Sequence, residues 1–166
     1  MEQAQDLVRE IERAFAGVCR PEEMLHPECM DGSEIAVFSR YHRWEDIDDK
    51  DIASEPSALC FVSADGFQFL CPAYMRYSVN RIGSGSSSVD STIYALSPSD
   101  EREAFQRSKY VRLSPSQRLA IRHFLEFMVE HAEEVDARAA SEGIEKVWIN
   151  AEQPSGANTA SPCSSA

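Results

Sequence analysis

The feature that most constrains the fold is a long helical repeat in the last third of the chain. It is introduced by Ser114-Pro115-Ser116-Gln117, where a serine cap, a proline at the first helical position and a later glutamine form a capping-box signature. Apolar residues then recur at spacings of three and four: Ile121, Phe124, Leu125, Met128, Ala132 and Val135. The pattern predicts one helix from Pro115 to about Ala140, ending before Gly143, that braces the domain.

A second amphipathic helix is predicted at the amino terminus. Leu7, Ile11 and Phe15 lie on one face of it and charged residues on the other, and Gly17 followed by Pro21 marks its end.

The middle of the chain carries the pattern of a β-hairpin. Residues 58–62 have the length and composition of a strand, residues 63–66 form a turn signal with a glycine, and residues 67–70 alternate like a second strand. Because an isolated hairpin is unstable, we expect this one, at about 58–70, to pack under helices. The predicted fold is therefore α+β and mostly helical. Six side chains are expected to meet in its core: Phe61, Phe67, Phe69, Tyr74, Phe124 and Met128.

The length of 166 residues suits one domain. We expect a single globular α+β domain over residues 1–149, in which residues 144–149 form a final strand or a docked extension. Residues 150–166 are rich in Ser, Ala and Pro with almost no apolar bulk, which predicts a disordered tail.

The net charge excludes some classes of partner. The chain has 28 acidic residues against 16 basic ones, a formal charge of -12, which argues against a dedicated nucleic-acid binder. No apolar run approaches the roughly 20 residues of a membrane span, and the acidic amino terminus does not resemble a signal peptide. We therefore expect a cytoplasmic protein whose five cysteines are free thiols, with its oligomeric state left open.

Most of the negative charge lies in the first third of the chain, and its densest run follows Trp44. Three apolar residues, Trp44, Ile47 and Ile52, are expected to anchor this run to the core. The candidate partner-binding residues are its carboxylates: Glu45, Asp46, Asp48, Asp49 and Asp51.

A calcium loop does not fit this acidic run. Counted from Asp46, position five is Lys50 and position six is Asp51, where an EF-hand needs an oxygen ligand and a glycine. Two interpretations remain, a solvated acidic face or a surface that docks a basic protein.

Cys19, His26 and Cys29 could supply three zinc ligands, with Glu28 as a poor fourth. The paired Cys-x-x-Cys spacing of structural zinc sites is absent, and a buried thiol pair beside a turn histidine explains the cluster equally. We therefore assign no metal and no cofactor, and keep an enzyme or metal protein using the His26 and Cys29 region as an alternative.

Two further features are weaker. Tyr74 and Tyr77 could line an aromatic ligand pocket. One basic stretch surrounds Tyr110 and consists of Arg102, Arg107, Lys109 and Arg112.

Four segments carry a resemblance to a known family. They are residues 67–75 (Phe-Gln-Phe-Leu-Cys-Pro-Ala-Tyr-Met), Ala14-Phe15, residues 44–47 (Trp-Glu-Asp-Ile), and residues 113–118 leading to Phe124-Leu125. Together they resemble an uncharacterised bacterial domain family in which such an aromatic-rich segment follows a strand. The resemblance covers most of residues 7–135 and implies a shared fold, with no activity, cofactor or catalytic residue.

The function expected from these observations is that of a non-enzymatic protein-interaction module. It would be inhibitor-like or immunity-like and would present its acidic run to a basic partner. A small-ligand-binding domain remains a further alternative.

Overall fold

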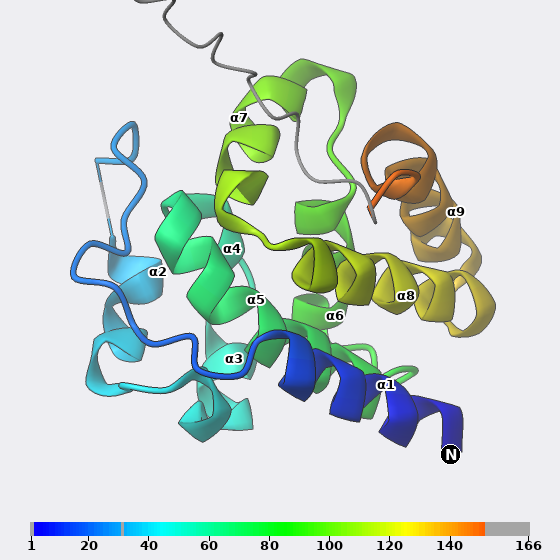
Figure 1. The fold of residues 1–166 in the computed structure, drawn as a ribbon, viewed down its shortest axis with the longest axis horizontal. Coiled ribbons are helices and arrows are strands. Elements are labelled where there is room, and N and C mark those ends of the chain that lie inside the picture. Colours follow the sequence, from blue (N-terminus) through cyan, green and yellow to red (C-terminus); the bar gives the residue numbers. More distant parts are fainter. Residues whose placement is uncertain (1, 31, 152–166) are drawn as a thin grey trace, which may run out of the picture.

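The predicted fold class is wrong, because the chain is built from helices. The structure is a computed structural model that describes residues 2–30 and 32–151. It is 71% helical with 3% strand, and it contains no sheet or hairpin, so the described chain is all-α (Figure 1). The extended pairing within the described residues is limited to two isolated bridges, Cys19 with Arg43 and Leu25 with Val62.

Short helices in the first half of the chain lead into longer ones. The α-helices are α1 Glu2–Ala14, α2 Ser33–Ala36, α3 Asp49–Ser54, α4 Ala58–Phe61, α5 Ala64–Asn80, α6 Ser87–Leu96, α7 Glu103–Ser108, α8 Pro115–His131 and α9 Glu134–Gly143. Single turns of 3₁₀ type are η1 Val37–Arg40, η2 Trp44–Asp46, η3 Asp100–Arg102 and η4 Lys109–Arg112, and a π-type turn, η5, spans Ile144–Trp148.

Helix α4 and the start of α5 occupy the place of the predicted hairpin, about residues 58–70. The Ser63 hydroxyl accepts a hydrogen bond from the Gly66 amide and caps α5, which then continues through Pro72. Gly66 is required there, since a Cβ would stand 2.6 Å from the carbonyl oxygen of Met24. Between Gly66 and Val79 every residue of α5 except Gln68 and Arg76 is buried, so this stretch lacks the polar stripe that marks a surface helix. A run that is apolar on all sides cannot be told from a strand by its period alone.

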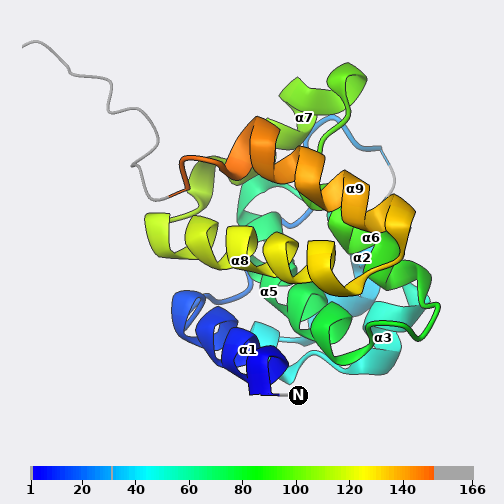
Figure 2. The ribbon, with the colours of Figure 1, turned by 90° about the vertical axis from the view of Figure 1, so that its right-hand side faces the viewer.

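Helix α5 lies at the centre of the molecule and packs against α1, α6 and α8. Figure 2 shows α1, α8 and α9 as successive layers on one side of it. The α1–α8 contact joins segments that are far apart in the sequence: Glu10 Oε1 lies 2.8 Å from His123 Nδ1, and Gln3 donates to Glu130 at 3.1 Å.

The long helix predicted over residues 115–140 is two helices. The capping box is present as predicted, but α8 ends at His131, and Ala132 and Glu133 are extended before α9 begins. Helices α8 and α9 then pack side by side as a helical hairpin (Figure 2). The apolar spacing in the sequence continues across the break, but Val135, the last residue of the predicted repeat, is 65% exposed.

The core prediction is confirmed for five of its six residues. Phe67, Phe69, Tyr74, Phe124 and Met128 are fully buried, and Phe61 is partly buried against them.

The end of the described chain is docked on this core. Residues 144–149 were predicted as a final strand or a docked extension, and they form the π-type turn η5. There the buried Trp148 donates its indole N–H to the Leu96 carbonyl at 2.7 Å. Most of the predicted tail over residues 150–166 lies outside the described residues, from residue 152 on. No helix of the described ranges is long and apolar enough to cross a membrane.

Candidate functional site

The acidic run is held to the core as its apolar residues predicted. Trp44, Ile47 and Ile52 are all buried, which confirms the three anchors. The Trp44 indole also donates a hydrogen bond to the Phe15 carbonyl at 3.0 Å, which ties η2 to the end of α1. The acidic side chains therefore stand on a fixed backbone.

Arg76 of α5 also holds the backbone of the acidic run in place. Its guanidinium donates to the carbonyl oxygens of Glu45 at 3.1 Å and Ile47 at 3.3 Å, and it lies 5.3 Å from the centre of the Trp44 ring. The hydrogen bonds of this arginine go to the main chain, and its charge contributes to the lowering of the Glu45 pKa.

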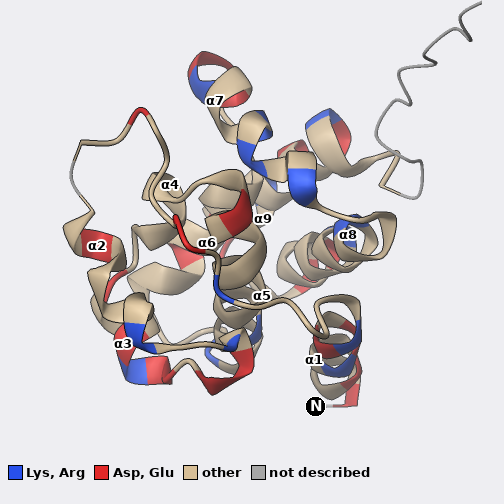
Figure 3. Ribbon diagram, turned by 60° about the vertical axis from the view of Figure 1, so that its left-hand side comes forward, with Lys and Arg blue, Asp and Glu red and all other residues tan. Residues whose placement is uncertain are grey.

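Three of the candidate carboxylates form ion pairs at the surface. Glu45 pairs with Arg43 at 3.1 Å, Asp48 with Lys50 at 3.1 Å, and Asp49 with Arg81 at 3.3 Å. Figure 3 shows the result, with acidic and basic segments alternating around α3.

The pKa values of two of these carboxyls respond to their partners. Partial burial alone would raise the pKa of Glu45, but the hydrogen bond and charge of Arg43 hold it below the ordinary value. The hydrogen bond from Lys50 lowers the pKa of Asp48.

The remaining two candidates behave differently from each other. Asp51 is only 7% exposed, and its Oδ2 accepts hydrogen bonds from Arg40 and from the Tyr41 hydroxyl. Asp46 is exposed and forms no ion pair with another described residue. The structure therefore brings Asp46, Asp48 and Asp49 to the surface, leaves Glu45 partly buried and turns Asp51 inward.

The residues proposed for zinc are not gathered. Cys19 pairs with Arg43 in a β-bridge, while His26 and Cys29 form a separate turn in which the Cys29 amide donates to the His26 carbonyl. The His26 Nδ1 accepts from the Glu28 amide at 3.2 Å. Among the described residues, no three His, Cys, Asp or Glu side chains lie close enough to hold a metal ion.

The tyrosines proposed for a ligand pocket lie inside the protein. Tyr74 is fully buried and donates its hydroxyl to the Glu55 carbonyl, and Tyr77 is 5% exposed with its hydroxyl bonded to Ser86. Both side chains belong to the packing of α5.

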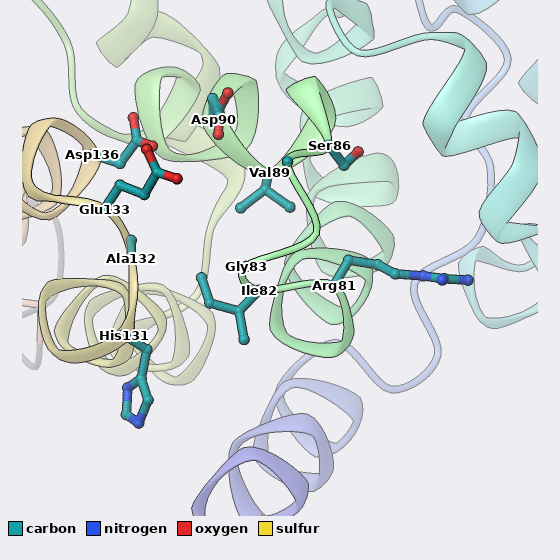
Figure 4. A pocket seen from close by; sticks show the side chains of 11 residues that line it. Arg81, Ile82, Gly83, Ser86, Val89, Asp90, His131, Ala132, Glu133 and Asp136 are labelled. Atoms are coloured by element: carbon teal, nitrogen blue, oxygen red, sulfur yellow. The ribbon is translucent and has the colours of Figure 1, made fainter.

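Figure 4 shows a small pocket between α6 and the start of α9, with a volume of about 110 Å³. The carboxylates of Asp90, Glu133 and Asp136 converge on one side of it, while Arg81 extends away from them (Figure 4). Burial, together with the nearby charge of Asp90, raises the pKa of Asp136. No local pattern in the sequence indicates this group, since Asp90 lies in α6 and Glu133 and Asp136 lie at the start of α9, more than forty residues later.

A larger pocket of about 340 Å³ lies where the turn after α1 meets α4 and α7. It brings Cys29 together with Cys60 and Lys109. The sequence showed Lys109 only as part of a basic stretch, because its burial depends on long-range packing.

Comparison with known proteins gives a family and nothing more specific. No curated protein and no solved structure matches the chain. A family model described as a family of unknown function (DUF6714) matches residues 3–152, nearly the whole of the described structure. This agrees with the resemblance to an uncharacterised domain family, and the chain belongs to the family of unknown function DUF6714.

Proposed function

We propose that this chain is a non-enzymatic protein-interaction module that docks a basic protein partner on its acidic run. The contact surface would consist of Glu45, Asp46, Asp48 and Asp49, on a single globular domain over residues 1–149. The observation that carries the proposal is the rigid support of these side chains, with Trp44 anchored in the core and Arg76 bonded to the carbonyls of Glu45 and Ile47. A preorganised surface loses little conformational entropy on binding.

The surface ion pairs are compatible with such a role. Exposed pairs of this kind contribute only about 0–1 kcal/mol, because water screens them. Arg43, Lys50 and Arg81 are each more than half exposed, so they are free to turn outward when a partner supplies its own cations. Asp51 is assigned a structural role, since it is buried and its Oδ2 already accepts hydrogen bonds from Arg40 and Tyr41.

An inhibitor-like or immunity-like protein would use a surface of this kind, since clustered charge speeds association with an oppositely charged protein. We place the protein in the cytoplasm as part of this proposal. The four described cysteines are free thiols, which suits a reducing compartment.

The test is affinity capture from a lysate of the cells that make the protein, with two charge-matched variants. The first is the triple variant Asp46→Asn, Asp48→Asn and Asp49→Asn. The control variant, Glu12→Gln, Glu142→Gln and Glu145→Gln, removes as many negative charges from exposed positions elsewhere. A basic partner retained by the wild type and the control and lost by the acidic-run variant supports the proposal. If both variants retain every captured protein equally, the acidic run is not the contact surface.

A further inference from the structure

The pocket between Cys29, Cys60 and Lys109 has the features of a ligand site that is separate from the acidic run. It is formed by three segments: the turn that carries Cys29, the end of α4 with Cys60 and Phe61, and the stretch from Arg102 to Lys109. Its volume of about 340 Å³ falls within the range, about 300–1,000 Å³, of pockets that hold small organic molecules.

The central observation is that Lys109 is buried without a counter-ion among the described residues. The residue is 3% exposed, yet its ammonium forms no ion pair with any described residue, whereas the other buried charge, Asp51, is paired with Arg40. The Lys109 Nζ donates to the carbonyl oxygens of Leu59 at 3.0 Å and Cys60 at 3.1 Å, the last turn of α4. An ammonium has three N–H donors, so these two bonds leave one donor unused.

The two carbonyls explain why the Lys109 ammonium lies where it does, but they do not neutralise its charge. The Lys109 ammonium caps these carbonyls at the end of α4, and the ring of Phe105, 4.7 Å from Nζ, adds a weak cation–π contact. All of these partners are neutral. Burial accordingly lowers the pKa of Lys109, as expected for a cation without a counter-ion.

A second cation lines the same pocket. Arg102 is exposed, forms no ion pair with another described residue, and lies close enough to Lys109 for its charge to lower the pKa of the lysine further. Glu28 stands on the pocket wall but pairs with neither cation. Two like charges thus share one cavity. An anion between them would offset their repulsion and supply the counter-ion that Lys109 lacks among the described residues.

Apart from Glu28 and Gln106, the rest of the wall is apolar and aromatic. Phe61 and Phe105 line the cavity, and the ring of His26 packs against that of Phe105 with 4.5 Å between ring centres. We propose that this pocket binds a small organic carboxylate, whose carboxylate group lies between Lys109 and Arg102 and whose aromatic or short aliphatic body packs on the two phenylalanine rings. Inorganic phosphate would satisfy the cations but leave the apolar wall without a partner.

The direct test is isothermal titration calorimetry of the full chain with benzoate and hexanoate. Benzamide, which has the shape of benzoate without its charge, and inorganic phosphate serve as matched probes. We expect benzoate or hexanoate to bind with a Kd of about 1 mM or tighter, and benzamide and phosphate at least about tenfold more weakly. The proposal is overturned if neither carboxylate binds, or if benzamide or phosphate binds as tightly.

Two variants locate the binding. Lys109→Met keeps most of the length of the side chain and removes its charge, and Arg102→Gln removes the charge of the exposed cation with a shorter polar side chain. Each should weaken benzoate binding by about tenfold, the value of one charge-assisted hydrogen bond. The control is Arg112→Gln, on the same basic stretch but paired with Asp65 and outside the pocket, which should leave the Kd unchanged. Because Lys109 caps α4, its variant could unfold, and the exposed Arg102 keeps the test decisive: equal Kd values for the variants at Arg102 and Arg112 would overturn the proposal.

The reactivity of the cysteines in the unsubstituted chain tests where the ligand binds. Cys60 lines the pocket and Cys19 does not, and both thiols are exposed. Saturating benzoate should slow the alkylation of Cys60 by iodoacetamide, followed by peptide mass spectrometry, and leave that of Cys19 unchanged. An unchanged rate at Cys60 would show that benzoate binds elsewhere and would overturn the assignment.

Discussion

Gly143 at the end of α9 lies directly against Ser97, the residue that follows α6. A Cβ added to Gly143 would stand 2.3 Å from the Ser97 Oγ and 3.0 Å from its Cα. Because the second distance involves main chain, a rotation of the serine side chain cannot relieve the clash. The glycine therefore allows the α6–α9 contact that places Trp148 on Leu96.

We predict that Gly143→Ala destabilises the protein by about 1–3 kcal/mol, the usual cost of overpacking. Urea unfolding followed by circular dichroism measures this change. Gly32→Ala is the control, since its added Cβ would meet nothing nearer than 3.4 Å, and its effect should stay within about 0.5 kcal/mol. Equal destabilisation by the two variants would contradict the proposed clash.

The cap of α8 leads to a second prediction. The Ser114 hydroxyl accepts from the Gln117 amide at 3.2 Å, and the Gln117 Oε1 accepts from the Ser114 amide at 3.0 Å and from Gln68 of α5 at 2.9 Å. Ser114→Ala should cost about 1 kcal/mol, as for other N-caps. Gln117→Ala should cost more, because it also breaks the link to α5, while Gln117→Glu keeps both acceptor bonds and should cost least. The order of the three unfolding free energies tests this assignment.

A third prediction concerns pH. The raised pKa of Asp136 means that the folded state retains this proton at pH values where the unfolded state has lost it. The folded state then binds more protons, so stability falls as the pH rises from the ordinary aspartate pKa through the raised one. Asp136→Asn should remove this part of the pH dependence and stabilise the protein at neutral pH. Urea titrations across the acidic range measure it, with Glu142→Gln as the control on the same helix. Parallel curves for wild type and Asp136→Asn would show that the carboxyl does not carry the effect.

The cysteines provide a fourth prediction. Complete burial raises the pKa of the Cys71 thiol, whereas Cys19 and Cys60 are exposed. Since alkylation requires both access and a thiolate, Cys71 should react only when the protein unfolds. Pulse labelling with iodoacetamide at increasing urea concentration should therefore show Cys71 reactivity rising with the global unfolding transition, and Cys19 reactive throughout. Reaction of Cys71 well below that transition would indicate local opening of α5.

Sequence patterns succeeded where the determinants of structure are local. The start of α8 follows from four adjacent residues that cap it, and the anchoring of the acidic run follows from its three apolar residues. They failed for α5, because a helix buried on all sides carries no polar stripe, and at Ala132, because the apolar repeat continues in the next helix.

The chemistry of the candidate sites depended on long-range packing that no local pattern records. The sequence indicated the carboxylates of the acidic run, but it did not indicate that Arg76 of α5 binds the main chain beneath them or that Arg81, just after α5, pairs with Asp49. For the same reason Lys109 was visible as a charge and not as a buried one, since its acceptors lie some fifty residues earlier in the chain.

The contact between α1 and α8 has a consequence for the order in which the chain assembles. Glu10 and His123 are 113 residues apart in sequence. During synthesis the first helix leaves the ribosome long before its partner exists, and the stripe formed by Leu7 and Ile11 has no complete surface to cover it until α8 has been made. The amino-terminal helix should thus be the first element translated and among the last to reach its final place, and a nascent chain stopped before residue 115 should present this stripe to chaperones.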